Sequence, residues 1–429
     1  MLLLSPSFGY IMVVEAEGIM LVKEICAFIT ATVSVLMAYF AVYYVIGFLA
    51  RTRAYPETDK RRRFAIITAA RNEERVIGNL LKTLREQDYP AELFDIFCVA
   101  DNCTDNTASI AREGGAHVYE RFDPSRARKG YALEFLFKNI ERDHGIASYD
   151  AYVFFDADNL VEGDFLTQMN RALESGADVV TGYRMASNFG ENFIAAAYGV
   201  HFMRSSAFSH RPRALLGLST HIAGTGFAVK SDLLTEGWKY FSLTEDTEFT
   251  MSVVSRGKKI AYCEEARFYD EQPTTMKIAV RQRLRWQKGR LVCFFKYSSL
   301  LIKGVFTKKG RKALSCYDMF FYLFPKSLFN FVMALVAFFA SLSAFNAGGV
   351  LGSVASAYAS FAFIGALTVV RELKNIPIRG ARLVLYVLLF PWFDLVALPL
   401  SLVSLCMREK WKPIPHKGKV TTEEKTACR

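Results

Sequence analysis

The chain has 429 residues, of which 52% are hydrophobic and 22% are charged, and its formal net charge is +11. This composition excludes an intrinsically disordered protein, and the length excludes a single small module. The high apolar fraction instead indicates membrane-spanning segments. The eight cysteines and six histidines are scattered without metal-ligand spacing. Neither a disulfide framework nor a zinc site is therefore expected.

The first predicted element is an N-terminal membrane anchor. Residues Ile25 to Ala50 carry no charge, and a cluster of arginines and lysines follows from Arg51. A run of this length can cross a bilayer, whereas a signal peptide would have a shorter apolar region followed by small residues. Because positive residues stay on the cytoplasmic side, the N-terminus is expected outside.

From Phe64 to Tyr269 the composition is that of a soluble α/β domain. Apolar strand-like runs alternate with helix-like stretches, which predicts a mostly parallel, Rossmann-like sheet with helices on both faces. Ligands of such sheets bind beyond the C-terminal ends of the strands. The predicted strands are Phe64–Ile67, Phe94–Val99, Ala151–Phe155 and Val179–Tyr183, and the predicted helices are Glu74–Glu86, Gly130–Asn139 and Phe165–Glu174.

The C-terminal third predicts about three further membrane segments. No charge occurs between Lys326 and Arg371, and this run is broken by the turn-like residues 346–349. Another apolar run, Leu383–Met407, contains a single acid, Asp394, which is expected to line a channel or to pair with a basic residue. Four spans would place the basic tail from residue 408 outside, although its positive charge favours the cytoplasm. The sequence leaves that conflict open.

Between the soluble domain and the last apolar runs lies a strongly basic stretch. Residues 272–312 contain twelve Lys or Arg and no acid. Such a patch suits either nucleic acid or an anionic membrane surface. Its neighbours are apolar spans, so membrane lipid is the expected partner and nucleic acid is not. Most of its charges, Arg283 and Arg290 among them, are expected to face lipid headgroups.

Two acidic motifs directly follow predicted strands. Asp156 and Asp158 stand two residues apart, a spacing at which two carboxylates can bind one divalent cation together with nucleotide phosphates. A solvated turn is the alternative interpretation. Asp101 follows the second strand and can accept hydrogen bonds from a base or ribose, whereas Asp105 is better explained as a helix cap.

Two more motifs are predicted to begin or to lie on helices. Glu245 and Asp246 open a helix whose N-terminus stabilises anions, which fits either a cap or a general base. Gln282, Arg285 and Trp286 share one face of a helix, where Arg can hold phosphate oxygens and Trp can stack on a sugar. An interfacial helix with Trp and Arg at headgroup depth is the alternative.

Taken together and in this order, the motifs resemble those of the membrane-integrated family-two glycosyltransferases, which include the cellulose, chitin-oligosaccharide, hyaluronan and poly-N-acetylglucosamine synthases. The resemblance runs from the first anchor to the last. The matching segments are Ala69–Glu73, Asp101, Lys129–Gly130, Asp156–Asp158, Gly224–Gly226, Thr244–Asp246 and Gln282–Trp286. Many relatives have paired acids where this chain has Ala100 and Asp101.

The resemblance implies a GT-A type nucleotide-sugar domain and assigns roles to particular residues. Asp246, with Glu245, would be catalytic, Asp246 acting as the general base, and Asp156 and Asp158 would hold Mg²⁺ or Mn²⁺. The implied nucleotide-sugar contacts are Ala70, Glu73, Asp101, Lys129, Asp156, Asp158 and Arg285. The implied acceptor contacts are Trp286, Gln282, Gly224 and Thr225.

The expected function is inverting transfer from a UDP-sugar to a growing β-linked saccharide at the membrane. A membrane-lipid acceptor, as in enzymes similar to ceramide glucosyltransferase, is the first alternative, and a catalytically silent binding module is the second. The protein is expected to be integral to a bacterial plasma membrane with its catalytic domain in the cytoplasm. The expected units are an anchor (1–50), a GT-A domain (51–270), basic interfacial helices (271–315), C-terminal membrane segments (316–407) and a basic tail (408–429). The sugar, the linkage and any accessory proteins are not determined.

Overall fold

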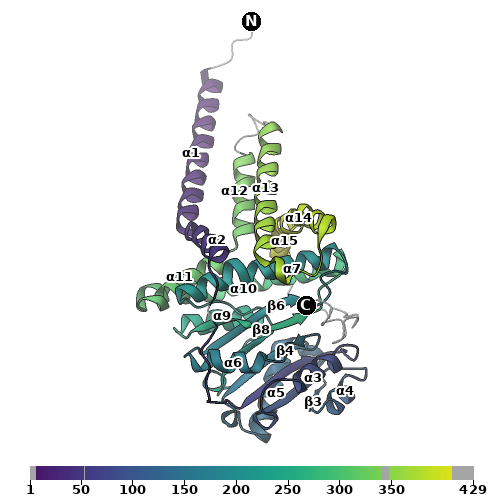
Figure 1. Cartoon of the computed structure of the whole chain (residues 1–429). Helices are drawn as coiled ribbons and strands as arrows, with labels where there is room; N and C mark the ends of the chain where they lie inside the picture. Colours follow the sequence, from purple (N-terminus) through teal and green to yellow (C-terminus); the bar gives the residue numbers. More distant parts are fainter. Residues whose placement is uncertain (1–5, 53, 340–346, 408–429) are drawn as a thin grey trace.

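A computed structural model describes residues 6–52, 54–339 and 347–407 (Figure 1). Its centre is an eight-stranded sheet with the strand order β3-β2-β1-β4-β7-β6-β8-β5. The strands are β1 (Phe64–Ala70), β2 (Phe94–Asp101), β3 (His117–Arg121), β4 (Ala151–Asp156), β5 (Leu160–Val161), β6 (Val179–Ala186), β7 (Phe227–Lys230) and β8 (Ile260–Asp270).

One half of the sheet is parallel, as predicted. Strands β3, β2, β1 and β4 run in the same direction, with Phe64 of β1 opposite both Phe94 of β2 and Ala151 of β4. The central residues of β1, β2 and β4 are buried on both faces, which is why these three strands read as continuous apolar runs. The C-terminal ends of β1, β2 and β4 therefore meet along one edge.

The other half makes the sheet mixed. Strand β7 is antiparallel to both β4 and β6, β6 pairs with β8 in parallel, and β5 is antiparallel to β8. Four of the seven strand pairings are parallel and three are antiparallel, so the predicted parallel pairing extends to β6 and β8, whereas β5 and β7 were not predicted. Strands β5 and β7 are two and four residues long, too short to give a recognisable periodic pattern.

Helices cover both faces of the sheet. Helices α3 (Ile77–Arg85), α4 (Thr107–Glu113) and α6 (Phe165–Glu174) contribute to one apolar core. Helices α5 (Lys129–Asp143), α9 (Glu245–Ser255), α10 (Met276–Thr307) and α11 (Arg311–Leu323) contribute to the other. The second core therefore joins the sheet to the basic stretch 272–312, most of which forms the long helix α10.

A third apolar cluster connects the sheet domain to the C-terminal helices. It contains residues of α7 (Phe193–Ser205), α10, α13 (Ala347–Glu372) and α14 (Gly380–Leu395). In Figure 1, α10 and α11 lie across the sheet domain, and α1 (Pro6–Met37), α12 (Lys326–Phe339) and α13 extend from them away from the sheet. The remaining helices are α2 (Tyr39–Leu49), α8 (Arg211–Leu216) and α15 (Ala397–Cys406).

Two helical stretches of the described chain are long and apolar enough to cross a membrane, Met20–Leu49 and Gly380–Cys406. The first overlaps the predicted anchor Ile25–Ala50, and the second overlaps the predicted last run Leu383–Met407. Helices α12 and α13 are the predicted pair, but residues 347–349 of the predicted turn instead begin α13, and residues 340–346 and the basic tail lie outside the described residues. The number of C-terminal spans and the domain boundaries stay predictions.

Candidate active site

A cavity of about 420 Å³ lies beyond the C-terminal ends of β1, β2 and β4, where the α/β pattern predicts a ligand site. Its wall is built from loops of the sheet domain together with α7, α10, α11 and α14. Twelve of the predicted site residues line it: Ala70, Glu73, Asp101, Lys129, Asp156, Asp158, Gly224, Glu245, Asp246, Gln282, Arg285 and Trp286.

The turn after β4 presents Asp156 and Asp158 to this cavity. The backbone N–H of Asp156 donates to Asn159 Oδ1 at 3.0 Å and to Thr225 Oγ1 at 2.9 Å. Asp158 Oδ2 accepts from the backbone N–H of Glu271 at 3.2 Å. The turn is thus held by hydrogen bonds, and both carboxylates face the cavity.

Thr225 does not belong to the acceptor wall, so that prediction is wrong. The side chain is 1% exposed and is absent from the cavity lining. Its hydroxyl group accepts a hydrogen bond from the backbone N–H of Asp156 and donates one to Asn159 Oδ1. Gly224 does line the cavity: its φ of +85° suits glycine, and a Cβ there would lie 3.6 Å from Asp246 Oδ2.

Lys129 lies between Asp156, a predicted metal ligand, and Glu245, a predicted catalytic residue. It begins α5, and its ammonium group pairs with Asp156, donates to the carbonyl of Gly224 at 2.9 Å and lies 3.9 Å from Glu245. One cation therefore bridges two acidic groups in the absence of ligand. An incoming diphosphate would offer this ammonium group a stronger anionic partner.

Glu245 and Asp246 form the first turn of α9, and both side chains are mostly buried. Burial raises the pKa of Glu245 to about 7, against the opposing effect of Lys129. Burial likewise raises the pKa of Asp246, while the backbone N–H of Thr247, Lys129 and Arg285 oppose the shift. A carboxylate with a raised pKa is a stronger proton acceptor, as a general base requires.

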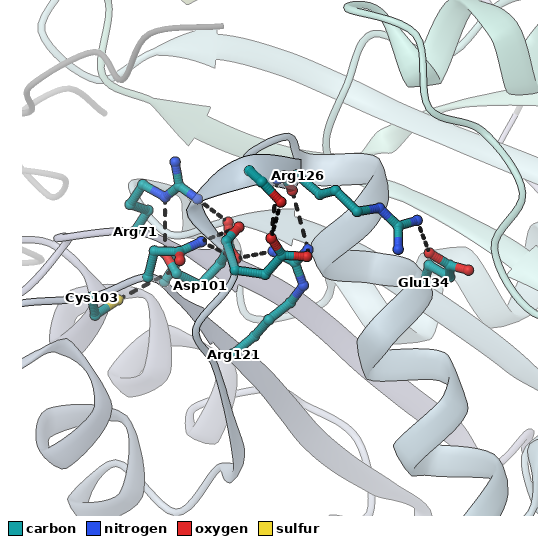
Figure 2. Close-up of polar contacts among 10 residues, drawn as sticks. Arg71, Asp101, Cys103, Arg121, Arg126 and Glu134 are labelled. Atoms are coloured by element: carbon teal, nitrogen blue, oxygen red, sulfur yellow. Dashed lines mark hydrogen bonds and ion pairs between the residues drawn. The ribbon is translucent and has the colours of Figure 1, made fainter.

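Asp101 is already engaged by two arginines (Figure 2). Arg71 contacts its carboxylate and donates to its carbonyl at 2.9 Å, and Arg121 donates to Asp101 Oδ1 at 2.6 Å. Asn102 donates to the same Oδ1 at 2.8 Å. These hydrogen bonds occupy most of the acceptor sites of the carboxylate. We therefore expect Asp101 to position Arg71 at the cavity wall more than to contact a ligand itself.

Helix α10 brings Gln282, Arg285 and Trp286 to the opposite wall. Gln282 Oε1 and Arg285 Nε are buried without a hydrogen-bond partner. The indole of Trp286 packs edge-on against Tyr198 of α7, with ring centroids 5.8 Å apart. Because unpaired buried polar atoms are costly, these two atoms indicate a site that a polar ligand completes.

The sequence matches the family model described as "Glycosyltransferase like family 2" over residues 61–289, which is more than half of the chain. The chain belongs to the family 2 glycosyltransferases. The matched segment contains every motif that lines the cavity from β1 to Trp286, and the structure has the GT-A-like fold that the motifs predicted.

The glycosyltransferase is similar to curated proteins and to solved structures. It is 27% identical to the probable glycosyltransferase YdaM of Bacillus subtilis, covering 62% of this chain and 63% of that protein. It is 26% identical to a beta-monoglucosyldiacylglycerol synthase of Nostoc, covering 63% of this chain and 58% of that protein. The chain thus spans less than two thirds of these relatives' length.

A solved structure of similar fold is the mannosyltransferase PcManGT from Pyrobaculum calidifontis, in complex with GDP-Man and Mn²⁺. The TM-score is 0.55 and the identity is 19%, over 82% of this glycosyltransferase and 98% of that chain. At this identity the likeness concerns the fold alone.

Several cavity residues of the glycosyltransferase were not predicted. Arg184 pairs with Asp270 and donates to the carbonyl of Ala223 at 2.9 Å, and Asp270 Oδ1 is buried without a partner. Asp270 ends β8, and Arg184 lies two residues before the end of β6. Arg71 belongs to the motif Ala69–Glu73, but no role was predicted for it.

Two basic residues of α10 do not face lipid headgroups, contrary to the prediction. Arg283 donates to the carbonyl of Phe393, and its guanidinium lies 4.1 Å from the centroid of that ring. Arg290 donates to the carbonyl of Tyr322. Both line the cavity because helices α11 and α14 pack over this face of α10.

The raised pKa values of the two carboxylates predict an acidic limb in the activity of the glycosyltransferase. A base works only when deprotonated, so kcat/KM for sugar transfer should fall as the pH is lowered through the raised pKa of Asp246.

Glu245 also binds its proton more tightly in the native protein than in the unfolded chain. Its contribution to the free energy of unfolding should therefore decline between pH 4.5 and about 7 as the pH rises.

The measurement is a pH series of kcat/KM and of Tm for the wild type and Glu245→Gln. The Tm difference between the two proteins should grow across that pH window and then level off. A difference that is constant across the window would contradict the raised pKa of Glu245.

Proposed function

We propose that the enzyme transfers a sugar from a UDP-sugar to a hydroxyl group of a membrane lipid, with inversion at the anomeric carbon. One observation carries the proposal. A single cavity is lined by the paired carboxylates after β4, by the half-buried Asp246 and by two residues of a candidate membrane span, Asp394 and Ala397. Donor chemistry and an apolar, membrane-type helix thus share one site.

The donor diphosphate would bind near Asp156, Asp158 and Arg285. Carboxylate oxygens are the ligands that Mg²⁺ and Mn²⁺ prefer, and Mg²⁺ is commonly held by one or two carboxylates plus substrate phosphates. No cluster of three or more potential protein ligands occurs within the described ranges, which fits a cation whose coordination the substrate completes. The unpartnered Asp270 Oδ1 in the same wall adds a further oxygen. Asp156 and Asp158 are therefore the residues we assign to the cation.

Neutralising the leaving group is the first chemical task. A bound divalent cation would supply Lewis-acid stabilisation of the diphosphate. Arg285 offers a planar guanidinium, and Lys129 offers an ammonium group that already lies among the acids. Both charges act in a partly buried site, where they stabilise developing negative charge more strongly than in water.

Asp246 would activate the acceptor. It removes the proton from the attacking hydroxyl group while the new bond to the anomeric carbon forms. The bond from that carbon to the diphosphate breaks, and UDP leaves with the electron pair. One direct displacement converts an α-linked donor into a β-glycoside, and no covalent enzyme intermediate is needed.

A lipid acceptor is favoured over a growing polysaccharide. Three of the similar curated proteins carry the name beta-monoglucosyldiacylglycerol synthase, at 25–26% identity. Two helical stretches of the described part of the chain are long and apolar enough to cross a membrane, and one of them borders the cavity. The enzyme would therefore work at the cytoplasmic face of the membrane, with residues 51–270 as its catalytic domain.

The test uses membranes that contain the full chain, a panel of UDP-sugars with GDP-mannose, and Mg²⁺ or Mn²⁺. Nucleotide release should occur with one donor and should be lost on chelation of the cation and restored by its return. The labelled product should then extract into organic solvent. A water-soluble ladder of products would instead establish the polysaccharide acceptor, and absence of release with every donor would contradict the proposed function.

A further inference from the structure

Part of the cavity wall has no role in the donor chemistry. It is formed by helices α7, α11 and α14 and by the loop before β7. We call it the helix-side wall and define it by His201, Ser205, His221, Tyr322 and Asp394. These residues come from four separate segments, so no single sequence motif predicts this wall.

His221 is the centre of this wall. It is 4% exposed, and its ring is stacked between His210 and Tyr322, with centroids 4.2 Å from each. Its Nε2 lies 3.4 Å from the hydroxyl of Ser205, but its Nδ1 is buried with no hydrogen-bond partner. The stacking fixes the ring, so a ligand that reached this nitrogen would supply the hydrogen-bond partner that the protein does not.

The polar groups of the helix-side wall are mostly uncharged. Burial lowers the pKa of His201 to about 3 and that of His221 well below its usual value, so both imidazoles are neutral. Arg204 is paired with Asp394, and its NH2 group also lies 3.1 Å from His201 Nδ1. Neutral imidazoles and a serine hydroxyl both donate and accept hydrogen bonds, as hydroxyl groups do. A phosphate would need cationic donors instead.

This wall also reaches the membrane-type helices. Asp394 lies in the candidate span Gly380–Cys406, and Tyr322 lies on α11 beside α10. In Figure 1, α14 and α15 lie over α7 and α10, on the side of the sheet domain from which α1, α12 and α13 extend. A headgroup could therefore enter this part of the cavity while its acyl chains remain on the apolar side.

We propose that His201, Ser205 and His221 form the acceptor subsite, which binds an uncharged, hydroxyl-bearing group such as a glycerol or sugar headgroup, with His221 Nδ1 making a hydrogen bond to it. The inference rests on the proposed function and deepens it by naming the acceptor's chemistry. His221 is a positioning residue here: it holds the acceptor, whereas Asp246 acts on the reacting hydroxyl.

The test compares His221→Phe with the matched control His210→Phe. Both variants replace a buried, stacked imidazole, but His210 does not line the cavity, and its Nδ1 is already bonded to Thr220 at 2.7 Å. With diacylglycerol in phosphatidylcholine vesicles as acceptor, His221→Phe should raise the acceptor KM about tenfold or more and His210→Phe less than about twofold. The dissociation constant for UDP, measured without turnover, should be equal in both, which reports intact donor binding. Equal acceptor KM values in the two variants would overturn the subsite.

A binding measurement that needs no turnover separates this inference from the proposed function. Diacylglycerol with a diazirine close to its glycerol end should label residues 193–221 or 322 in the wild type and label His221→Phe less. Labelling without sugar transfer from any donor would support the subsite and contradict the proposed function. Transfer accompanied by labelling elsewhere would overturn the subsite.

Two competitors decide the chemistry of the headgroup. Free glycerol or glucose that suppresses labelling at lower concentration than diacylglycerol would support the hydroxyl subsite but assign it to a soluble acceptor, against the lipid proposal. Vesicles of phosphatidic acid that suppress labelling more strongly than diacylglycerol would overturn an uncharged headgroup and point to Arg290 as a phosphate contact.

Discussion

Replacing Asp246 with asparagine is expected to reduce sugar transfer by about 100- to 10,000-fold, the usual contribution of a positioned general base. The amide keeps the size of the side chain but cannot take the proton of the acceptor hydroxyl group. The start of α9 should be retained, because the amide oxygen of asparagine can still accept from the backbone N–H of Thr247, and the carbonyl of residue 246 still accepts from Thr250 Oγ1. The measurement is initial-rate transfer with saturating donor, together with the donor dissociation constant.

The matched control for this prediction is Glu245→Gln, which removes the neighbouring carboxylate. Glu245 lies 3.9 Å from Lys129 and shares the first turn of α9, so its loss should change donor binding more than the chemical step. A loss of kcat in Glu245→Gln as large as that in Asp246→Asn would contradict the assignment of Asp246 as the base. An unchanged donor dissociation constant in Asp246→Asn is required for the assignment to hold.

Replacing Asp318 with alanine is expected to destabilise the protein by about 3–5 kcal/mol, because it leaves a buried guanidinium unpaired. Arg213 of α8 and Asp318 of α11 are 0% and 1% exposed and form two hydrogen bonds, of 2.6 and 2.9 Å. Tyr39 of α2 also donates to Asp318 at 2.9 Å, so the pair joins the N-terminal helices to the sheet domain. The measurement is the free energy of unfolding of the protein in detergent, determined from thermal or denaturant unfolding.

The double variant Arg213→Met with Asp318→Leu is the control. Both charges are then absent, so no buried charge is left without a partner, and most of the lost stability should return. The exposed pair Lys239 and Glu236 provides a comparison, since replacing Glu236 with glutamine should change the stability very little. If Asp318→Ala were as stable as that surface variant, the pair would not connect the two parts of the molecule energetically.

The strands that the sequence predicted share one physical property. Strands β1, β2, β4 and β6 are buried on both faces and therefore appear as continuous apolar runs. Strand β8, although 11 residues long, was missed because charged side chains interrupt its pattern: Glu264 pairs with Arg211, and Arg267 lies over the ring of Tyr183. These partners come from distant segments, so the charges look solvent-exposed in the sequence alone.

The candidate site divides in a similar way. Asp156, Asp158, Glu245, Asp246, Gln282, Arg285 and Trp286 occur in short local motifs, and all of them line the cavity. Thr225 occurs in such a motif as well, but only the packing of the loop against β4 turns its hydroxyl away from the cavity and toward Asn159. Local spacing can thus name a motif without determining which of its side chains faces the ligand.

The pairing of Asp394 illustrates the same limit within the C-terminal helices. An acid in an apolar run predicts a partner or a channel, and the structure supplies Arg204 of α7, 190 residues earlier in the chain. It also brings Asp394 to the cavity wall. An isolated charge in an apolar run can be recognised in the sequence, but its partner cannot, because nothing in the local pattern records which helix packs beside it.

The amino-acid order was sufficient for the family, for the parallel half of the sheet and for the acidic and Gln-x-x-Arg-Trp motifs, since each depends on residues that lie close together in the chain. Tertiary packing decided the antiparallel pairings of β5 and β7, the arginines around Asp101, the inward direction of Arg283 and Arg290, and the stacked histidines. These features depend on contacts between segments tens to hundreds of residues apart. Burial and hydrogen bonding select such contacts only once the whole chain has folded.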